Sequence, residues 1–589
     1  MPLRPLPPRL APHLSSLATV AVVALSLAAC AAGSDEGWWS IGFGHAAQAA
    51  ASPSDGETAT GSYLAGRAAL DAGDLRGAAQ GFEAALAAAP DNLELRRQVF
   101  ALLLSSGELD SALEAARDLS QRDAAPDEAV LLLGLDATKR GADTEALRLL
   151  EGLGRGNIAG PVQPILVAWA RYASGARAQA IDELAVADPN SGLDRLRSYH
   201  RVAMLDLAGR ARDGLDALHG AFPDLAAAPV RVLGTALELQ LAAGDRAAAD
   251  ATIDAARKAA PDDRQVQQLA AALAAGKREL SPIRSPADGM GDALLSISEA
   301  FFEQERNAEA MVLARSATFV APRDDETWLT VARISLAQQN PTEALAALDR
   351  ISASGPTAWA AGLARARALQ DLNRPDEAVK LLESMAEQAP ERSDALIAMG
   401  DLLRGKDRFA EAEAAYTRAV QRLPKIERSD WRLLYARGIT YERTKRWPQA
   451  EADLLKALEL EPDQPFVLNY LGYSWVDQGL NLDRAKGMLH RAVELRPDDG
   501  FIVDSLGWAY YRLGEHEKAV TYLERAVELE PGDPVLNDHL GDVYWRVGRQ
   551  REARFQWQRA LVFKPEPDAV AAIQAKLANG LGAQAPSPG

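Results

Sequence analysis

The sequence has little of what an enzyme or a disulfide-bonded domain needs. Its 589 residues include one cysteine, Cys30, and aromatic residues make up only 6% of the chain. A single thiol excludes an intramolecular disulfide, so the fold must be held together by packing. The sequence also lacks HExxH, GxSxG and GxxxxGK[ST] motifs and any cysteine–histidine cluster. We therefore expect a protein that is not an enzyme, with no catalytic residue, metal site, cofactor or small-molecule substrate.

Positive charge is also scarce. The chain has 64 Lys and Arg against 82 Asp and Glu, a formal net charge of −18. A surface this acidic is a poor partner for nucleic acid. The charges are dispersed, as in the run from Glu411 to Arg418, which is typical of solvated helix faces.

Three small residues recur together toward the C-terminus, and each series steps by 34, 35 or 38 residues. They are Gly400, Gly438, Gly472, Gly507 and Gly541; Ala412, Ala450, Ala485, Ala519 and Ala553; and Pro424, Pro462, Pro497, Pro531 and Pro565. The pattern resembles the tetratricopeptide repeat, a helical hairpin of 34 residues. The resemblance implies an all-α superhelical solenoid whose concave face binds other proteins.

One copy, residues 500–531, shows the physical basis of the unit. Val503 and Leu506 lie on one face of a first helix, and a second apolar face follows after a Gly-containing turn. Gly507 and Ala519 are small where the two helices must approach closely, so a larger side chain there would overpack the pair. Neither helix can bury its apolar stripe alone, and stacked hairpins create the core.

We expect roughly 13 to 14 such hairpins, which a hinge could divide into two solenoids. The predicted division is a degenerate N-terminal solenoid (62–280), a hinge (281–292), a C-terminal solenoid (293–566), a capping helix (567–581) and a disordered tail (582–589). The hinge is suggested by Pro282, Pro286, Gly289 and Gly291. The alternative is a long loop inside one continuous superhelix.

The N-terminus has the features of an export signal. Residues 1–29 contain a short basic region and then an uncharged, mostly apolar run from Ser15 to Ala29. The run ends in Leu27-Ala28-Ala29-Cys30, which resembles the lipobox of bacterial lipoproteins. That resemblance implies cleavage before Cys30 and lipidation of its thiol. Because Ala31 rather than Asp follows, it also implies the periplasmic face of the outer membrane in a Gram-negative bacterium.

Residues 30–61 are rich in Ala, Gly and Ser and are predicted to be a flexible tether. Trp38 and Trp39 interrupt it. They either touch the bilayer interface, where Trp is favoured, or cap the first hairpin.

Aromatic, charged and amide side chains are concentrated in the last hairpins. In tetratricopeptide repeats, certain positions of the first helix face the concave groove. The matching positions here are Asn469, Tyr473, Asp477, Asp504, Trp508, Tyr511, Arg512, Asp538, Asp542, Trp545 and Arg546. Aromatic and Arg side chains dominate binding hot spots, so these residues are candidates for a peptide or partner-helix groove. The alternative is that Trp508 and Trp545 pack between neighbouring helices.

His490, His516 and His539 fall in three successive hairpins but at different repeat positions. We expect them to be surface or hydrogen-bonded residues rather than ligands of one metal.

The segments LGYSWVD, DSLGWAYYRLG and DHLGDVYWRVGR carry a more specific likeness. Over about residues 465–562, the chain resembles the tetratricopeptide-repeat outer-membrane lipoproteins of proteobacteria. Some members are adaptors that bind a C-terminal processing protease and present peptidoglycan hydrolases to it. The resemblance implies a periplasmic scaffold with those partners. The alternative is an assembly factor for the outer membrane, a pilus or an exopolysaccharide secretion machine, and the sequence does not decide between them.

Overall fold

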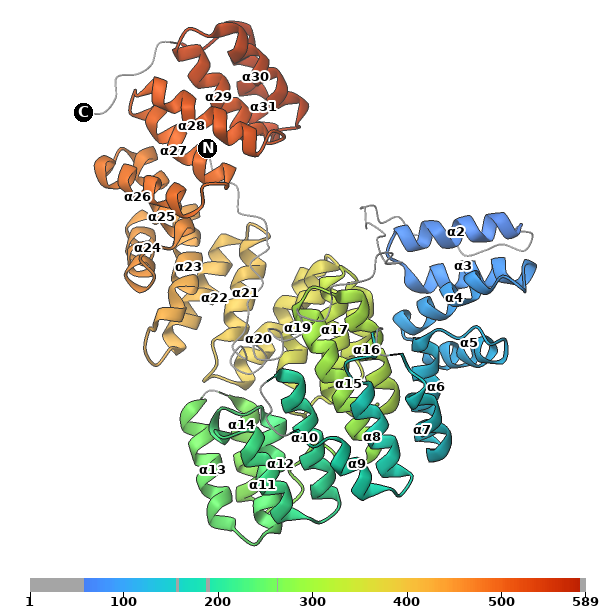
Figure 1. Ribbon diagram of the computed structural model, residues 1–589. Coiled ribbons are helices and arrows are strands. Elements are labelled where there is room, and N and C mark those ends of the chain that lie inside the picture. The colour runs from blue at the N-terminus through green and yellow to red at the C-terminus, as the bar shows by residue number, and fades with distance from the viewer. Residues whose placement is uncertain (1–57, 155–157, 187–190, 262, 583–589) are drawn as a thin grey trace. The chain divides into compact units, whose positions relative to one another are not determined.

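The structure is a computed structural model that describes residues 58–154, 158–186, 191–261 and 263–582. These residues form 30 α-helices and two short 3-10 helices, with no β-strand among them (Figure 1). The predicted all-α fold is therefore confirmed. The predicted signal peptide, Cys30, Trp38, Trp39 and nearly all of the tether and the tail lie outside the described residues.

The chain divides into two compact units, residues 1–378 and 379–589, and the division falls within α20. The helices of the first unit are α2 (Ala59–Asp71), α3 (Leu75–Ala88), α4 (Leu93–Ser106), α5 (Leu109–Gln121), α6 (Asp127–Lys139), α7 (Asp143–Glu151), α8 (Gln163–Ala173), α9 (Arg177–Glu183), α10 (Gly192–Leu207), α11 (Ala211–Ala221), η1 (Leu225–Ala227), α12 (Val230–Ala242), α13 (Arg246–Ala259), α14 (Arg264–Ala274), α15 (Pro286–Glu303), α16 (Asn307–Val320), α17 (Asp325–Ala337), α18 (Pro341–Leu348) and α19 (Ala358–Asp371). The remaining helices are α20 (Pro375–Gln388), α21 (Asp394–Arg404), α22 (Phe409–Arg422), η2 (Arg428–Asp430), α23 (Trp431–Arg443), α24 (Trp447–Leu460), α25 (Pro465–Gln478), α26 (Leu482–Leu495), α27 (Gly500–Arg512), α28 (His516–Leu529), α29 (Pro534–Arg546), α30 (Gln550–Val562) and α31 (Pro567–Asn579).

Consecutive helices pack in hairpins, as the repeat pattern predicts. The small residues stand where the helices of a hairpin meet. A Cβ atom on Gly507 would lie 2.7 Å from Cγ of Leu523 on the facing helix, and Ala519 is fully buried. The sequence-based explanation of these positions is confirmed, because a side chain at Gly507 would have to displace its neighbour.

In the first unit, the hairpin α15–α16 packs against the first helices of the N-terminal hairpins. α16 contacts α4 and α6, and α15 contacts α6, α8 and α10. Lys139, at the end of α6, donates a 2.8 Å hydrogen bond to the carbonyl of Phe319 near the end of α16. Arg315 of α16 reaches the carbonyl of Ser105 in α4 and forms an ion pair with Glu343 of α18. Segments about 200 residues apart in sequence are therefore joined.

The composition of these two helices explains their position. Every residue of α16 from Ala310 to Val320 is buried, and so are eleven residues of α15. A helix that is apolar on all sides is stable only when other elements surround it. The inner surface of the N-terminal hairpins is therefore core rather than open groove.

The segment predicted as a hinge is hydrogen-bonded to the first unit. Leu280 and Ser281 donate their amides to Glu238 of α12, both bonds being 2.8 Å long. Residues from Pro286 onward already belong to α15, and a Cβ atom on Gly289 would lie 2.2 Å from the ring of Trp169. Pro286 therefore starts a helix and Gly289 allows close packing, while the boundary between the two compact units lies at 378/379.

The second unit has its own apolar core, which runs from Trp431 in α23 to Ile573 in α31. The last helix, α31, packs on α30. Among the helices in the residues that the structure describes, none is both long enough and apolar enough to span a membrane.

Candidate partner-binding surface

The predicted groove residues of the second unit lie on α25, α27 and α29, each the first helix of its hairpin. The starts of α27 and α29 are fixed by Asp499 and Asp533, whose side chains each accept hydrogen bonds from two backbone amides of the first turn. The side chain of Gln464 caps α25 in the same way. These caps fix the residues at which the three helices begin.

On α27, three of the candidates are part of the hairpin packing. The ring of Trp508 is stacked between Tyr511, at 4.6 Å between centroids, and His539 of α29, at 3.9 Å. Asp504 accepts hydrogen bonds from Nδ1 of His539 at 3.0 Å, and both side chains are buried. The alternative interpretation therefore holds for Trp508, because its ring fills the space between two helices. Asp504 and Tyr511 are likewise not open groove residues.

The environment of His539 favours its charged form. Burial lowers the pKa of His539, but the nearby carboxylates of Asp504, Asp538 and Asp542 raise it by more, so that its pKa lies above the ordinary value of 6.5. His539 thus joins α29 to α27 through a charge-assisted hydrogen bond.

On α29, the inner face is covered by α31. Nζ of Lys576 donates to Oδ1 and Oδ2 of Asp538 at 2.9 and 2.8 Å and to Oδ2 of Asp542 at 2.8 Å. Asp542 also accepts a 2.9 Å hydrogen bond from Nε1 of Trp557. The prediction that Asp538 and Asp542 line an open groove is corrected, because both are buried beneath a helix of the same chain.

Trp545 and Arg546 are also engaged by the C-terminal segment. The Trp545 ring lies 5.5 Å from the ring of Trp557 and directly against Gly580. Arg546 donates a 2.7 Å hydrogen bond to the carbonyl of Gly582. The last hairpin therefore presents its candidate residues to α31 and to the residues that follow it.

Four candidates remain, none of them fully buried, and we call them the α25–α27 strip: Asn469, Tyr473, Asp477 and Arg512. The first three are spaced four residues apart on α25, so they lie along one face of that helix. Asp477 and Arg512 form a 2.7 Å ion pair between hairpins, with side chains 51% and 38% exposed. Oδ1 of Asn469 is buried and accepts no hydrogen bond in the described residues. Burial first, and then Asp504 and Asp477, raises the pKa of Tyr473, so its hydroxyl stays protonated.

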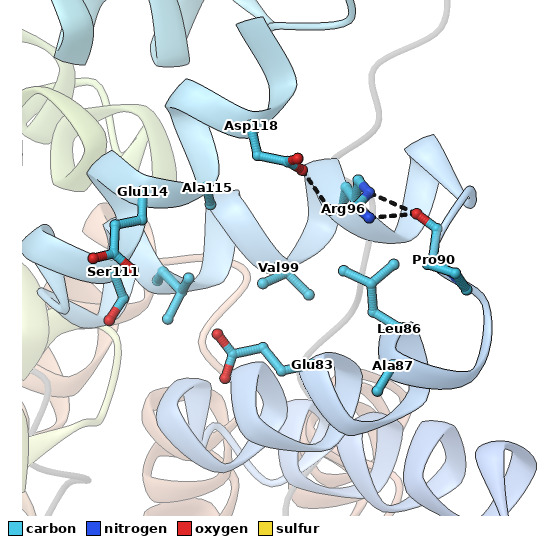
Figure 2. A pocket seen from close by; sticks show the side chains of 11 residues that line it. Glu83, Leu86, Ala87, Pro90, Arg96, Val99, Ser111, Glu114, Ala115 and Asp118 are labelled. Atoms are coloured by element: carbon cyan, nitrogen blue, oxygen red, sulfur yellow. Dashed lines mark hydrogen bonds and ion pairs between the residues drawn. The ribbon is translucent and has the colours of Figure 1, made fainter. Parts of the chain in front are cut away.

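The first unit has an open pocket of about 480 Å³ between α3, α4 and α5 (Figure 2). Apolar side chains and carboxylates both line it, and Figure 2 shows them converging from the three helices. The lining residues are Glu83, Leu86, Ala87, Pro90, Arg96, Val99, Leu103, Ser111, Glu114, Ala115 and Asp118.

Some charged side chains of this pocket are paired with each other and others are not. Nε of Arg96 donates a 2.9 Å hydrogen bond to the carbonyl of Pro90, and its guanidinium pairs with Asp118. Within the described residues, Glu83 and Glu114 have neither a hydrogen bond nor an ion pair. Burial, and then the charge of Glu108, raises the pKa of Glu83. An apolar floor with two free carboxylates suits the stem and charged head of a Lys or Arg side chain.

A buried polar network in the first unit was not anticipated from the sequence. Nε1 of Trp169 donates a 3.2 Å hydrogen bond to Nδ1 of His200, and Arg231 donates a 3.1 Å hydrogen bond to Asp292. Nε2 of His200 and Oδ2 of Asp292 are 3.6 Å apart, and neither has a hydrogen-bond partner among the described residues. Burial, and then Arg231, lowers the pKa of His200 to about 3, so the ring is neutral. Trp169, His200 and Asp292 are buried, so these three residues belong to the core of the first unit.

The other described residues offer little that could bind a metal or catalyse a reaction. In the part of the chain that the structure describes, no group of three or more His, Cys, Asp or Glu residues could hold a metal ion. His490 bonds the Tyr510 hydroxyl at 2.6 Å, and His516 packs beside Tyr511. The described residues form helical hairpins throughout and include no separate catalytic domain.

Comparison with protein families identifies the hairpins. Three family models described as tetratricopeptide repeat match residues 329–393, 369–438 and 504–533. The chain is a tetratricopeptide-repeat protein. Tetratricopeptide repeats are protein-binding modules, and proteins built from them are usually scaffolds without catalytic activity.

Several solved structures resemble this repeat array at low sequence identity. The APC/C hetero-tetramer Cut9–Hcn1 is 14% identical over 79% of this chain and 98% of that one, with a TM-score of 0.38. A tetratricopeptide-repeat protein from Parabacteroides merdae is 15% identical over 43% and 99% of the two chains, with a TM-score of 0.36. The repeat protein YrrB is 21% identical over 33% and 97%, with a TM-score of 0.26. No curated protein matches the sequence.

Proposed function

We propose that this tetratricopeptide-repeat protein is a lipid-anchored scaffold on the periplasmic face of the outer membrane, and that its second unit binds a protein partner. The observation that carries the proposal is the α25–α27 strip. It combines the partly exposed aromatic ring of Tyr473 with the exposed Asp477–Arg512 ion pair. Tyr and Arg are among the residues that contribute most to protein interfaces.

The anchor in this proposal rests on the N-terminal sequence. Leu27-Ala28-Ala29-Cys30 ends an apolar export signal, and Cys30 is the only cysteine of the chain. Several acyl chains on one cysteine hold a protein stably at a bilayer, whereas one chain binds only marginally. The Ala- and Gly-rich residues before the first hairpin then act as a spacer.

For the partner, we propose a C-terminal processing protease together with the peptidoglycan hydrolases that it cleaves. The support is the likeness of residues 465–562 to the proteobacterial lipoproteins that carry out this role. That stretch contains the whole α25–α27 strip. A scaffold that holds protease and substrate together raises their effective concentration without performing chemistry.

The test is crosslinking and pull-down from membranes with the full mature chain as bait. Substitution of both Asp477→Ala and Arg512→Ala should reduce recovery of the protease at least about fivefold, the effect of losing one contributing interface residue. A matched control is the double substitution Asp463→Ala and Arg491→Ala, because this exposed 2.9 Å ion pair links the loop before α25 to α26 and lies outside the strip. The control should capture the partner as the wild type does.

Equal recovery by both double variants would show that the strip does not bind the partner. Recovery of pilus or polysaccharide-export components in place of a protease would favour the assembly-factor role and would refute the proposed partner.

A further inference from the structure

The attachment of α31 to the second unit buries little apolar surface. Ile573 is its single buried residue, while Ala569 and Leu577 are only partly buried against the core. Lys576, in contrast, donates all of its hydrogen bonds to two carboxylates, and its side chain is 18% exposed. A helix with so little buried apolar surface is a weakly held element of a repeat array.

The face beneath α31 requires a cation. Asp538 and Asp542 are one helical turn apart on α29, and their side chains are only 4% and 8% exposed. Burial raises the pKa of Asp542, and Lys576 partly offsets that effect. Without Lys576 the two carboxylates would repel each other in a buried site, which is strongly unfavourable for folding. Whatever covers this face must therefore bring a positive charge.

A second contact adds a requirement for glycine. Gly580 ends α31 with φ +70°, and a Cβ atom there would lie 1.9 Å from the ring of Trp545. The chain then continues to Gly582, whose carbonyl accepts from Arg546. Lys576 and Gly580 are four residues apart, so the face of α29 recognises a helix that carries a lysine one turn before a C-terminal glycine.

We propose that the inner face of α29 is a binding site for a lysine-bearing helix of a protein partner, and that α31 fills the site until such a helix replaces it. The identity of the partner rests on the proposed scaffold function, but the site itself does not. An incoming helix supplies the cation that Asp538 and Asp542 require, so exchange never leaves them unpaired. The bound partner would then lie beside the α25–α27 strip, because Trp508 on α27 already stacks on His539 of α29.

The experiment uses a labelled synthetic peptide with the sequence of residues 564–582 and measures fluorescence anisotropy with the full mature chain. The chain is used as wild type and with Ile573→Ala, which loosens α31 without changing the face of α29. The loosened chain should bind the peptide at least about tenfold more tightly than the wild type, because its own helix competes less.

The peptide offers a matched pair of lysines. Lys576→Ala in the peptide should weaken binding at least about tenfold, whereas Lys564→Ala should leave it within twofold, because the Lys564 side chain is exposed and lies outside the contacts with α29. Asp538→Asn in the loosened chain should weaken binding of the unchanged peptide, and hydrogen exchange of α29 amides checks that the helix stays folded.

Equal binding of the two lysine variants would overturn the proposal, and so would absence of binding to a loosened chain in which hydrogen exchange shows α31 released. If Ile573→Ala does not release α31, Lys576→Ala in the chain is the second variant and the same outcomes apply. Peptide binding that persists when no protease is captured would refute the proposed function while leaving this site intact.

Discussion

The closest approach of two helices in the last hairpin gives a quantitative test of the repeat packing. The perturbation is Gly541→Ala. A Cβ atom at this position would lie 2.4 Å from Cδ1 and 2.5 Å from Nε1 of Trp557, whose side chain is fully buried. Carbon atoms pack favourably at about 3.5–4.0 Å, so the indole ring must move by about 1 Å. That movement also strains the hydrogen bond from Trp557 to Asp542.

Two contributions of opposite sign decide the magnitude. Alanine is favoured over glycine inside a helix by about 1 kcal/mol, whereas overpacking a core costs about 1–3 kcal/mol. Gly487→Ala isolates the first contribution, because Gly487 lies inside α26 with nothing within 4 Å of its would-be Cβ atom. Gly438→Ala should fall between the two, since its nearest neighbour, Cγ of Leu454 at 3.0 Å, belongs to a side chain that can rotate.

Hydrogen exchange followed by mass spectrometry is the appropriate assay, because repeat arrays open locally and have no single free energy of unfolding. Gly487→Ala should slow exchange in α26, and Gly541→Ala should accelerate it in α29 and α30. The difference between the two effects should correspond to about 1–3 kcal/mol, or about five- to 150-fold in protection. If Gly541→Ala increased protection as much as Gly487→Ala, the indole would yield freely and the packing argument would be refuted.

Three further predictions concern charge and anchoring. Arg315→Met leaves Glu343 unpaired beneath α16 and should destabilise the first unit by about 3 kcal/mol, seen as faster exchange in α16 and partly reversed by adding Glu343→Gln. Because the pKa of His539 is raised in the fold, its contribution to stability is complete below about pH 6.5 and is lost as the pH rises through that raised pKa. Protection of α29, corrected for intrinsic exchange, should therefore fall as the pH rises above about 6.5, and His539→Gln should make this fall smaller; an unchanged profile would contradict the assignment. Cys30→Ala should abolish palmitate labelling and outer-membrane fractionation, and a variant that retained both would rule out the lipid anchor.

The fold was predictable because its information is local. The recurrence of glycine, alanine and proline reports contacts between helices about 16 residues apart, such as Gly507 with Leu523, and these contacts repeat along the chain. The packing of α15–α16 against α4, α6 and α8 depends on segments more than 100 residues apart, and a repeat period contains no information about such pairs. The available signal was compositional, since residues 307–320 contain only two charged residues, Glu309 and Arg315.

The candidate site was only partly predictable for a related reason. The repeat pattern identifies which residues of a first helix face the groove. It does not show whether another segment of the chain already covers those residues. Asp538 and Asp542 occupy such positions and are nevertheless buried. Lys576 was the missing residue, and its spacing from Ile573 on the last helix is the signal that could have placed it on the same face. For Asp477 and Arg512 the predicted positions do lie at an accessible surface.

Two helices cover inner helices of the same chain, α16 in the first unit and α31 in the second. They differ in how much of each helix is buried. In the first unit, Arg315 is 3% exposed and binds the carbonyl of Ser105 near the C-terminus of α4, where a cation also complements the helix dipole. The helix that carries Arg315 is buried at every residue from Ala310 to Val320, so it cannot leave without exposing a large part of the core. Lys576 has a comparable electrostatic role, but it sits on a helix with one buried side chain and is partly accessible to water. Exchange with a partner therefore costs little apolar burial at α31 and a great deal at α16, which places a replaceable segment at the C-terminal end of the array, on the hairpin that follows the α25–α27 strip.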